Sequence, residues 1–193
     1  PECGASAPDH LHFQAGSTEV LPLLTSWPRL QRGLVTLCSI NEGNEISVLP
    51  DWICPAIVIR SKNAECGEAM FKRVYDALPV NEGQPEPMMN IIGWMAAGQC
   101  VTVVFPRGKH RPDCYYADGD GKTLVSPGAL DMGGLIITPR KCDFDSITPD
   151  TAYAILHEVS LPEAKLRQAI DKIRENPTHD ENGEKPAKEQ NEP

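Results

Sequence analysis

Several features that define other protein classes are missing from this sequence of 193 residues. It contains no apolar run close to the roughly 20 residues that a membrane-spanning helix needs, so we expect no membrane span. It contains no Gly-x-Gly-x-x-Gly or Walker sequence, which leaves a Rossmann site and a phosphate loop unsupported. The formal net charge is −9, which argues against a general nucleic-acid binder with its usual basic face.

The seven cysteines are odd in number and form no Cys-x-x-Cys pair. This pattern argues against a disulfide framework and against a zinc ribbon. It favours reduced thiols that pack as small apolar side chains. We therefore expect a cytoplasmic protein, and the sequence nominates no cofactor.

The residues that are present predict an α+β fold of antiparallel strands with flanking helices. A hairpin turn is expected at Gly98–Gln99, and Thr148 before Pro149 is a helix-start signal. Ser160 with Glu163 resembles a capping box. Strands are expected at 33–40, 45–50, 55–60, 89–97, 100–107 and 133–140, and helices at 67–78, 149–159 and 162–175.

The stretch "APDHLHFQAGS", residues 7–17, places polar and apolar residues in alternation. In a β-strand, His10, His12 and Gln14 would line one face, while Leu11 and Phe13 would face the other. A helix would scatter the same three polar residues. The pattern therefore favours a strand that presents two imidazoles and an amide together.

Three interpretations of this strand are open. It could be a half-buried strand with a polar outer face. The two histidines could also bind a metal ion, but such a site needs a third ligand, and the spacing of the other residues does not identify one. The strand could also serve catalysis at phosphorus, because a neutral imidazole can attack a phosphate ester. In that case Gln14 could donate to a phosphoryl oxygen, Gly4 would let backbone amides approach an anion, and Ser6 would add a hydroxyl donor.

Basic residues gather in "PRGKHRP", residues 106–112, directly after a predicted strand. Arg107, Lys109 and Arg111 could hold a phosphate there through charge-assisted hydrogen bonds. A solvated basic turn is the alternative, and it is the preferred interpretation of Arg140 and Lys141.

The stretch "GASAPDHLHFQAG" resembles the active-site segment of the histidine-triad superfamily, in the branch where glutamine replaces the third histidine. The galactose-1-phosphate uridylyltransferases and diadenosine tetraphosphate phosphorylases share this pattern, and "HLHFQA" is most similar to the GDP-L-galactose and GDP-D-glucose phosphorylases. The later stretches "MNIIGW", "VTVVFPR" and "VSPGALDMGGLIITPRKCDFDSITPDTAYAILHEVSL" follow the order seen in the same phosphorylases.

This resemblance implies an enzyme that transfers a nucleotidyl group from a nucleoside diphosphate sugar, with GDP-hexose as the expected substrate. By that resemblance His12 is the nucleophile that forms a nucleotidyl-histidine, His10 supports it and Gln14 steadies the phosphoryl group. In some uridylyltransferases the residue matching His10 also ligates a structural metal such as zinc. Inorganic phosphate or a sugar phosphate would accept the nucleotidyl group.

The resemblance also implies a chain organisation. We expect residues 1–60 to end a first histidine-triad-like unit, residues 61–175 to form a second unit without catalytic histidines, and residues 176–193 to be a disordered polar tail. The chain would then be the later portion of a two-unit protein. Superfamily members often dimerise, so a homodimer is also expected.

Other functions remain open at this point. A hexose-1-phosphate nucleotidyltransferase or a dinucleoside polyphosphate phosphorylase would use the same His12 chemistry with a different acceptor or substrate. A metal-binding module built on His10 and His12, or a noncatalytic nucleotide-binding module, would belong to a different class.

Overall fold

The computed structural model describes residue 3, residues 14–17 and residues 19–175. The strands are β1 (Val35–Asn41), β2 (Asn44–Val48), β3 (Ile57–Ser61), β4 (Met89–Ala96) and β5 (Gln99–Pro106). The helices are α1 (Pro22–Thr25), α2 (Trp27–Leu30), α3 (Ala64–Ala77), α4 (Asp113–Tyr116), α5 (Ala129–Met132), α6 (Lys141–Ser146), α7 (Pro149–Val159) and α8 (Glu163–Glu175). Short 3-10 turns are η1 (Gln31–Gly33) and η2 (Gly119–Gly121).

The strands form one five-stranded antiparallel sheet in the order β1-β2-β3-β5-β4. Together with the flanking helices, this sheet confirms the predicted α+β class. The pairing of β3 with β5 joins residues on both sides of position 60 into the same sheet. The assignment of these segments to two related units stays a prediction.

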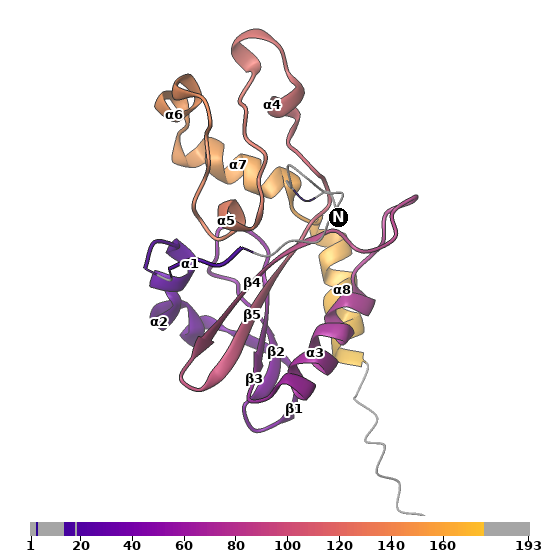
Figure 1. Cartoon of the computed structure of the whole chain (residues 1–193). Helices are drawn as coiled ribbons and strands as arrows, with labels where there is room; N and C mark the ends of the chain where they lie inside the picture. Colours follow the sequence, from indigo (N-terminus) through magenta and orange to yellow (C-terminus); the bar gives the residue numbers. More distant parts are fainter. Residues whose placement is uncertain (1–2, 4–13, 18, 176–193) are drawn as a thin grey trace, which may run out of the picture.

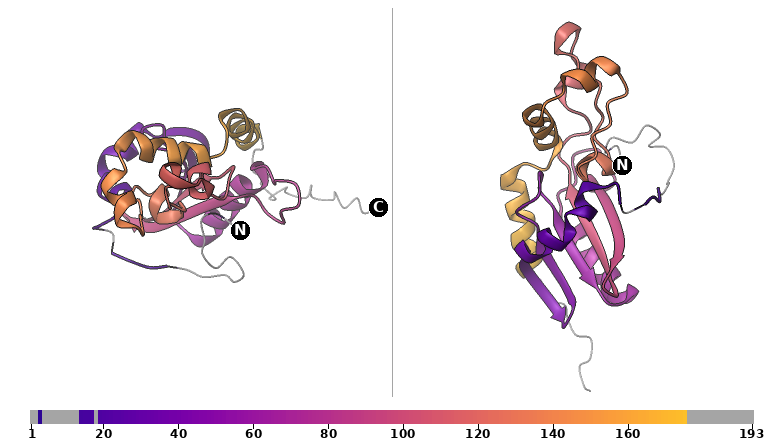
Figure 2. Two further views of the ribbon diagram at one scale, coloured as in Figure 1. Left: turned by 90° about the horizontal axis from the view of Figure 1, so that it is seen from above. Right: turned by 90° about the vertical axis from the view of Figure 1, so that its left-hand side faces the viewer.

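Each face of the sheet supports its own apolar cluster. Alternate side chains of a strand point to opposite faces, so Val58 and Val103 belong to one cluster while Ile57 and Val104 belong to the other. Figure 1 shows α3 and α8 on one side of the sheet and α1 and α2 on the other. The right-hand view of Figure 2 shows that the strands occupy one end of the molecule and helices α4, α6 and α7 the other.

The first cluster is built on the side of α1 and α2, and it also includes residues of α5 and α7. Its most buried helical members are Leu23, Leu30, Met132, Leu156 and Val159. The second cluster is covered by α3 and α8. It includes Met70, Val74, Ala169 and Ile173 from these helices.

Most of the expected elements are confirmed with small shifts in their ends. Helix α3 begins three residues earlier than expected because the side chain of Asn63 caps it, accepting a hydrogen bond from Cys66 N at 2.8 Å. Thr148 caps α7 as predicted, since its Oγ1 accepts from Thr151 N at 3.2 Å. Among the described residues, none of the helices has the length and apolar character to cross a membrane.

The β4–β5 hairpin is present, but its turn lies one residue earlier than predicted. Ala96 pairs with Gln99, so the turn residues are Ala97 and Gly98. Both have positive φ, 49° and 78°. This is the combination that a tight type I′ turn requires.

The strand predicted at 133–140 is wrong. These residues, all of them described, are not part of a strand, because their backbone amides bond locally instead of to a neighbouring strand. Leu135 N donates to Leu130 O at 3.0 Å, and Ile137 N donates to the carboxylate of Asp131 at 2.8 Å.

The capping box predicted at Ser160 and Glu163 is also wrong. Ser160 is buried, and its hydroxyl donates to Leu156 O at 2.7 Å, back into the last turn of α7. Ser160 forms an isolated antiparallel bridge with Arg107. The buried hydroxyl therefore helps to end α7 and does not start α8.

Candidate active site

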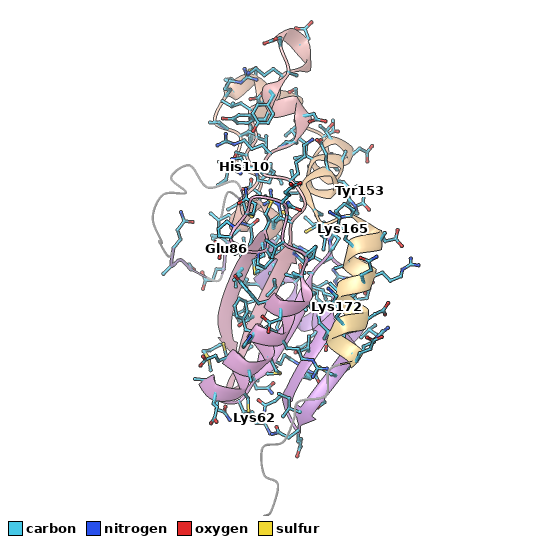
Figure 3. All side chains as sticks on the ribbon, turned by 90° about the vertical axis from the view of Figure 1, so that its right-hand side faces the viewer. Lys62, Glu86, His110, Tyr153, Lys165 and Lys172 are labelled. Carbon is cyan, nitrogen blue, oxygen red and sulfur yellow. The ribbon has the colours of Figure 1, made fainter. Side chains whose placement is uncertain are left out.

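Cys3 contacts the sheet where β4 begins and β5 ends. Cys3 is buried there, and its carbonyl oxygen accepts a hydrogen bond from Asn90 Nδ2 at 3.0 Å. Figure 3 places Glu86, which precedes β4, and His110, which follows β5, near this same end of the sheet. Cys3 directly precedes Gly4, the first of the predicted site residues in the sequence.

Arg107, the first residue after β5, is the centre of this region and is only 2% exposed. Its Nε and two Nη groups donate to five acceptors, so every guanidinium N–H has a partner. Four acceptors are main-chain carbonyls and the fifth is the side chain of Asn90. The acceptors are Val159 O, Pro127 O, Lys109 O, His110 O and Asn90 Oδ1.

This geometry corrects the expectation that Arg107 holds a phosphate. A guanidinium whose five donors already bond to protein acceptors has none to offer a ligand without breaking one of those bonds. Burial lowers the pKa of Arg107, while the nearby Cys3, Cys54 and Asp131 act in the opposite direction. Arg107 therefore organises its surroundings and does not itself face a substrate.

Lys109 is engaged by carboxylates in the structure. Its Nζ forms ion pairs with Asp113 and Glu158, and these hydrogen bonds raise the pKa of the lysine. Glu158 also accepts from Asp113 N at 2.7 Å, which ties α4 to the last turn of α7. A phosphate at Lys109 would have to compete with both carboxylates.

Arg111 differs from both neighbours. Its Nε donates to Ser126 Oγ at 2.8 Å, and its guanidinium lies 4.3 Å from the centroid of the Tyr115 ring. Stacking on an aromatic ring and one hydrogen bond fix the plane of the guanidinium. Of the three basic candidates, Arg111 is the one whose guanidinium is held in a fixed orientation and forms no ion pair among the described residues.

The loop opposite the basic residues is held by the same arginines and by a buried carboxylate. Ser126 contacts Arg111, Pro127 contacts Arg107, and Gly128 N donates to Asp131 Oδ2 at 2.9 Å. Asp131 is 4% exposed, and burial raises its pKa although the amides of Gly128 and Ile137 oppose that shift. The loop from 126 to 131 therefore has its backbone fixed from both sides.

The remaining predicted site residues are not brought together by the described structure. Gly4, Ser6, His10 and His12 lie outside the described residues, and Gln14 is exposed. The described residues contain no group of three or more His, Cys, Asp or Glu side chains that could hold a metal ion. The contribution of Gly4, Ser6, His10, His12 and Gln14 to the site stays a prediction.

Four residues of this region were not predicted from the sequence: Asn90, Cys3, Ser126 and Asp131. The one available signal was at Asn90, since asparagine is depleted in strands and here interrupts the apolar run of β4. Cys3 and Ser126 are recognisable only through contacts with residues far away in the sequence, and Asp131 only through the conformation of its own loop.

Comparison with protein families gives a match over most of the chain. Residues 33–178 match the family described as GDPGP1-like, C-terminal domain. The chain belongs to this GDPGP1-like family. The matched range includes all five strands and every residue of the cluster around Arg107 except Cys3.

The family match supports the resemblance to GDP-sugar phosphorylases, and through it an enzyme that acts on GDP-sugars. A second, short match covers residues 1–17 and is to a domain of unknown function, DUF4922. It contains the predicted motif. Searches of curated proteins and of solved structures gave no match.

Proposed function

We propose that this GDPGP1-like chain takes part in phosphorolysis of a GDP-hexose through a covalent nucleotidyl-His12 intermediate. The observation that carries the proposal is the family match over residues 33–178, which agrees with the independent resemblance of "HLHFQA" to the same enzymes. We also propose membership of the histidine-triad superfamily on the basis of that motif.

The proposed reaction is a double displacement. A neutral ring nitrogen of His12 attacks the α-phosphorus, a nitrogen–phosphorus bond forms, and the bond from that phosphorus to the bridging oxygen breaks. Hexose 1-phosphate leaves with the bridging oxygen and its electron pair. Inorganic phosphate then attacks the same phosphorus, which releases GDP and regenerates neutral His12.

Other residues receive supporting roles in this proposal. His10 supports the nucleophile, while Gln14 and Ser6 donate hydrogen bonds to phosphoryl oxygens and Gly4 allows backbone amides to approach. Arg111 is the described cation best oriented for a phosphate, with Lys109 next to it.

Intact mass spectrometry of the full-length protein tests the intermediate. The protein is mixed with a panel of nucleoside diphosphate sugars without phosphate and then quenched. We expect an added mass of one nucleoside monophosphate, retained in wild type and absent in His12→Ala, and the mass identifies the base. Gln14→Ala should form the adduct about 100- to 1,000-fold more slowly, as expected for a lost oxyanion donor.

Addition of phosphate or hexose 1-phosphate to the isolated adduct identifies the acceptor. Release of GDP by phosphate supports a phosphorylase, whereas loss of the adduct only with hexose 1-phosphate, which forms a nucleoside diphosphate hexose, identifies the transferase instead. A folded full-length protein that forms no adduct with any sugar nucleotide would contradict the His12 mechanism.

A further inference from the structure

We propose that Asn90 and Arg107 are positioning residues that hold the motif-bearing N-terminal segment against the basic loop 107–111. The inference rests on the proposed function, because it assigns a role in that reaction to two residues that do not contact the substrate.

The side chain of Asn90 uses both ends of its amide in this region. Nδ2 donates to Cys3 O at 3.0 Å, and Oδ1 accepts from an Nη of Arg107. The amide therefore joins a main-chain group of the N-terminal segment to a buried cation. Since an amide can donate and accept at once, asparagine suits this position better than a residue that can do only one of these.

Arg107 extends the connection to the loop that carries the basic candidates. The same guanidinium donates to the carbonyls of Lys109 and His110, both at 3.1 Å, so it fixes the backbone immediately before Arg111. A continuous path of hydrogen bonds thus runs from Cys3 through Asn90 and Arg107 to loop 107–111. Cys3 is 4% exposed and Arg107 is 2% exposed, so water competes little with these bonds.

The substitution Asn90→Asp separates the two contacts. A carboxylate still accepts from Arg107, but it cannot donate to Cys3 O and places a negative oxygen beside that carbonyl. The variant should therefore keep a contact with Arg107 and lose the hydrogen bond to Cys3 O. Asn63→Asp is the matched control, because it makes the same chemical change at the cap of α3, where aspartate is equally suitable.

The catalytic test is a comparison of kcat and KM for GDP-hexose phosphorolysis by the full-length proteins. Misplacement of a reacting group lowers the rate of the chemical step, so Asn90→Asp should lower kcat by about 10- to 100-fold. We expect KM to change less than kcat, because the proposed contacts of the same segment, from Ser6 and Gln14, act on the phosphoryl group that is transferred. Asn63→Asp should keep wild-type values.

A second measurement reports on anchoring and does not depend on catalysis. Pulse labelling of thiols followed by mass spectrometry compares Cys3 with the buried Cys54 and the exposed Cys142 in the same molecule. In Asn90→Asp, labelling of Cys3 should become about tenfold faster through local opening, while Cys54 keeps its slow rate. Equal protection of Cys54 shows that the variant remains folded.

The outcomes separate the inference from the function on which it rests. Lower kcat with faster labelling of Cys3 supports the positioning role, and wild-type kcat in Asn90→Asp overturns it. If the wild type itself turns over no sugar nucleotide, the proposed function fails. The rate of thiol labelling then tests whether Asn90 anchors Cys3. An unchanged labelling rate of Cys3 in Asn90→Asp overturns this anchoring role.

Discussion

The cost of burying the charge of Arg107 is offset by hydrogen bonds to acceptors placed around its guanidinium group. Removing a cation from water is costly unless each of its donors finds a partner, and here five oxygens surround one planar group. Lysine at this position would have three donors on a single atom and could not reach the same set. The arrangement explains why a charged residue directly follows the apolar strand β5.

A second arginine stabilises the fold through a buried carboxylate. Arg140 donates from Nε and Nη2 to both oxygens of Asp143 at 2.7 Å, and Asp143 also accepts from Leu124 N. These hydrogen bonds hold the pKa of Asp143 below its ordinary value. The pair therefore stabilises the folded chain above the pKa of the unfolded-state carboxyl, and this contribution is lost as pH falls through the folded-state pKa.

We predict that Asp143→Asn lowers the midpoint of thermal unfolding at neutral pH and that its deficit shrinks as pH falls. At low pH the wild-type carboxyl is itself protonated, so both proteins then lack the charge. Thermal unfolding from about pH 7 to about pH 3 measures the difference.

Asp145→Asn is the control for this substitution, because Asp145 is an exposed partner of Lys141 in the same helix. Exposed pairs contribute little, so the control should unfold near the wild-type temperature throughout. A deficit of Asp143→Asn that stayed constant with pH would contradict the assigned role.

Among the elements, the β4–β5 hairpin has a turn that its sequence fits only in part. Ala97 has φ of 49°, a conformation that its Cβ disfavours, whereas the following Gly98 adopts its positive φ without such a penalty. Asparagine tolerates this conformation better than alanine, and Asn-Gly is the preferred pair for such turns.

We predict that Ala97→Asn stabilises the chain by about 0.5–1 kcal/mol, part of the usual penalty for a left-handed residue. Gly98→Ala should destabilise it by about 1 kcal/mol, since its surroundings are open and only the backbone penalty acts. Urea unfolding of both variants measures the two changes. Equal effects of the same sign would show that the turn has another conformation.

Local patterns predicted the elements where the signal lies within a few residues. The cap at Thr148 and the helix predicted at 67–78 are of this kind, and both are confirmed. The segment 133–140 has equally apolar residues, but the amides of Leu135 and Ile137 bond locally, to Leu130 O and to the Asp131 carboxylate. The sequence could not show this, because periodicity says nothing about which partner strand is available.

The same limit applied to the candidate site. The basic run 106–112 left phosphate contacts and a solvated basic turn both open, and the sequence could not distinguish the roles of its members. Arg107 and Arg111 cannot be told apart from the sequence. The structure distinguishes them, because Arg107 is buried and bonded to the surrounding main chain, whereas Arg111 stacks on Tyr115. Asn90 acquires its role solely through contacts with Cys3 and Arg107.

At the scale of the whole molecule, the single sheet lies between two apolar clusters. All three tryptophans, Trp27, Trp52 and Trp94, belong to the first cluster or pack against it. Trp27 and Trp94 contact each other edge to face, with ring centroids 5.0 Å apart. Tryptophan fluorescence therefore reports on one face of the sheet, whereas circular dichroism reports on all helices and strands.

We predict that a cavity in the second cluster destabilises the first cluster by the same amount. Ile173 is fully buried on the inner face of α8, so Ile173→Ala should cost about 2–5 kcal/mol and Ile173→Val about 0.5–1.5 kcal/mol. If the sheet couples both faces, the urea midpoints from fluorescence and circular dichroism should fall together. A fluorescence midpoint that stays at the wild-type value would show that the two faces unfold separately.

The acceptors of Arg107 have a consequence for how this protein can diverge. Four of the five are main-chain carbonyls, and every amino acid supplies one whatever its side chain. Mutations at Lys109 or His110 can therefore change the side chains that the loop presents, while Arg107 continues to bind the main-chain carbonyls of both positions.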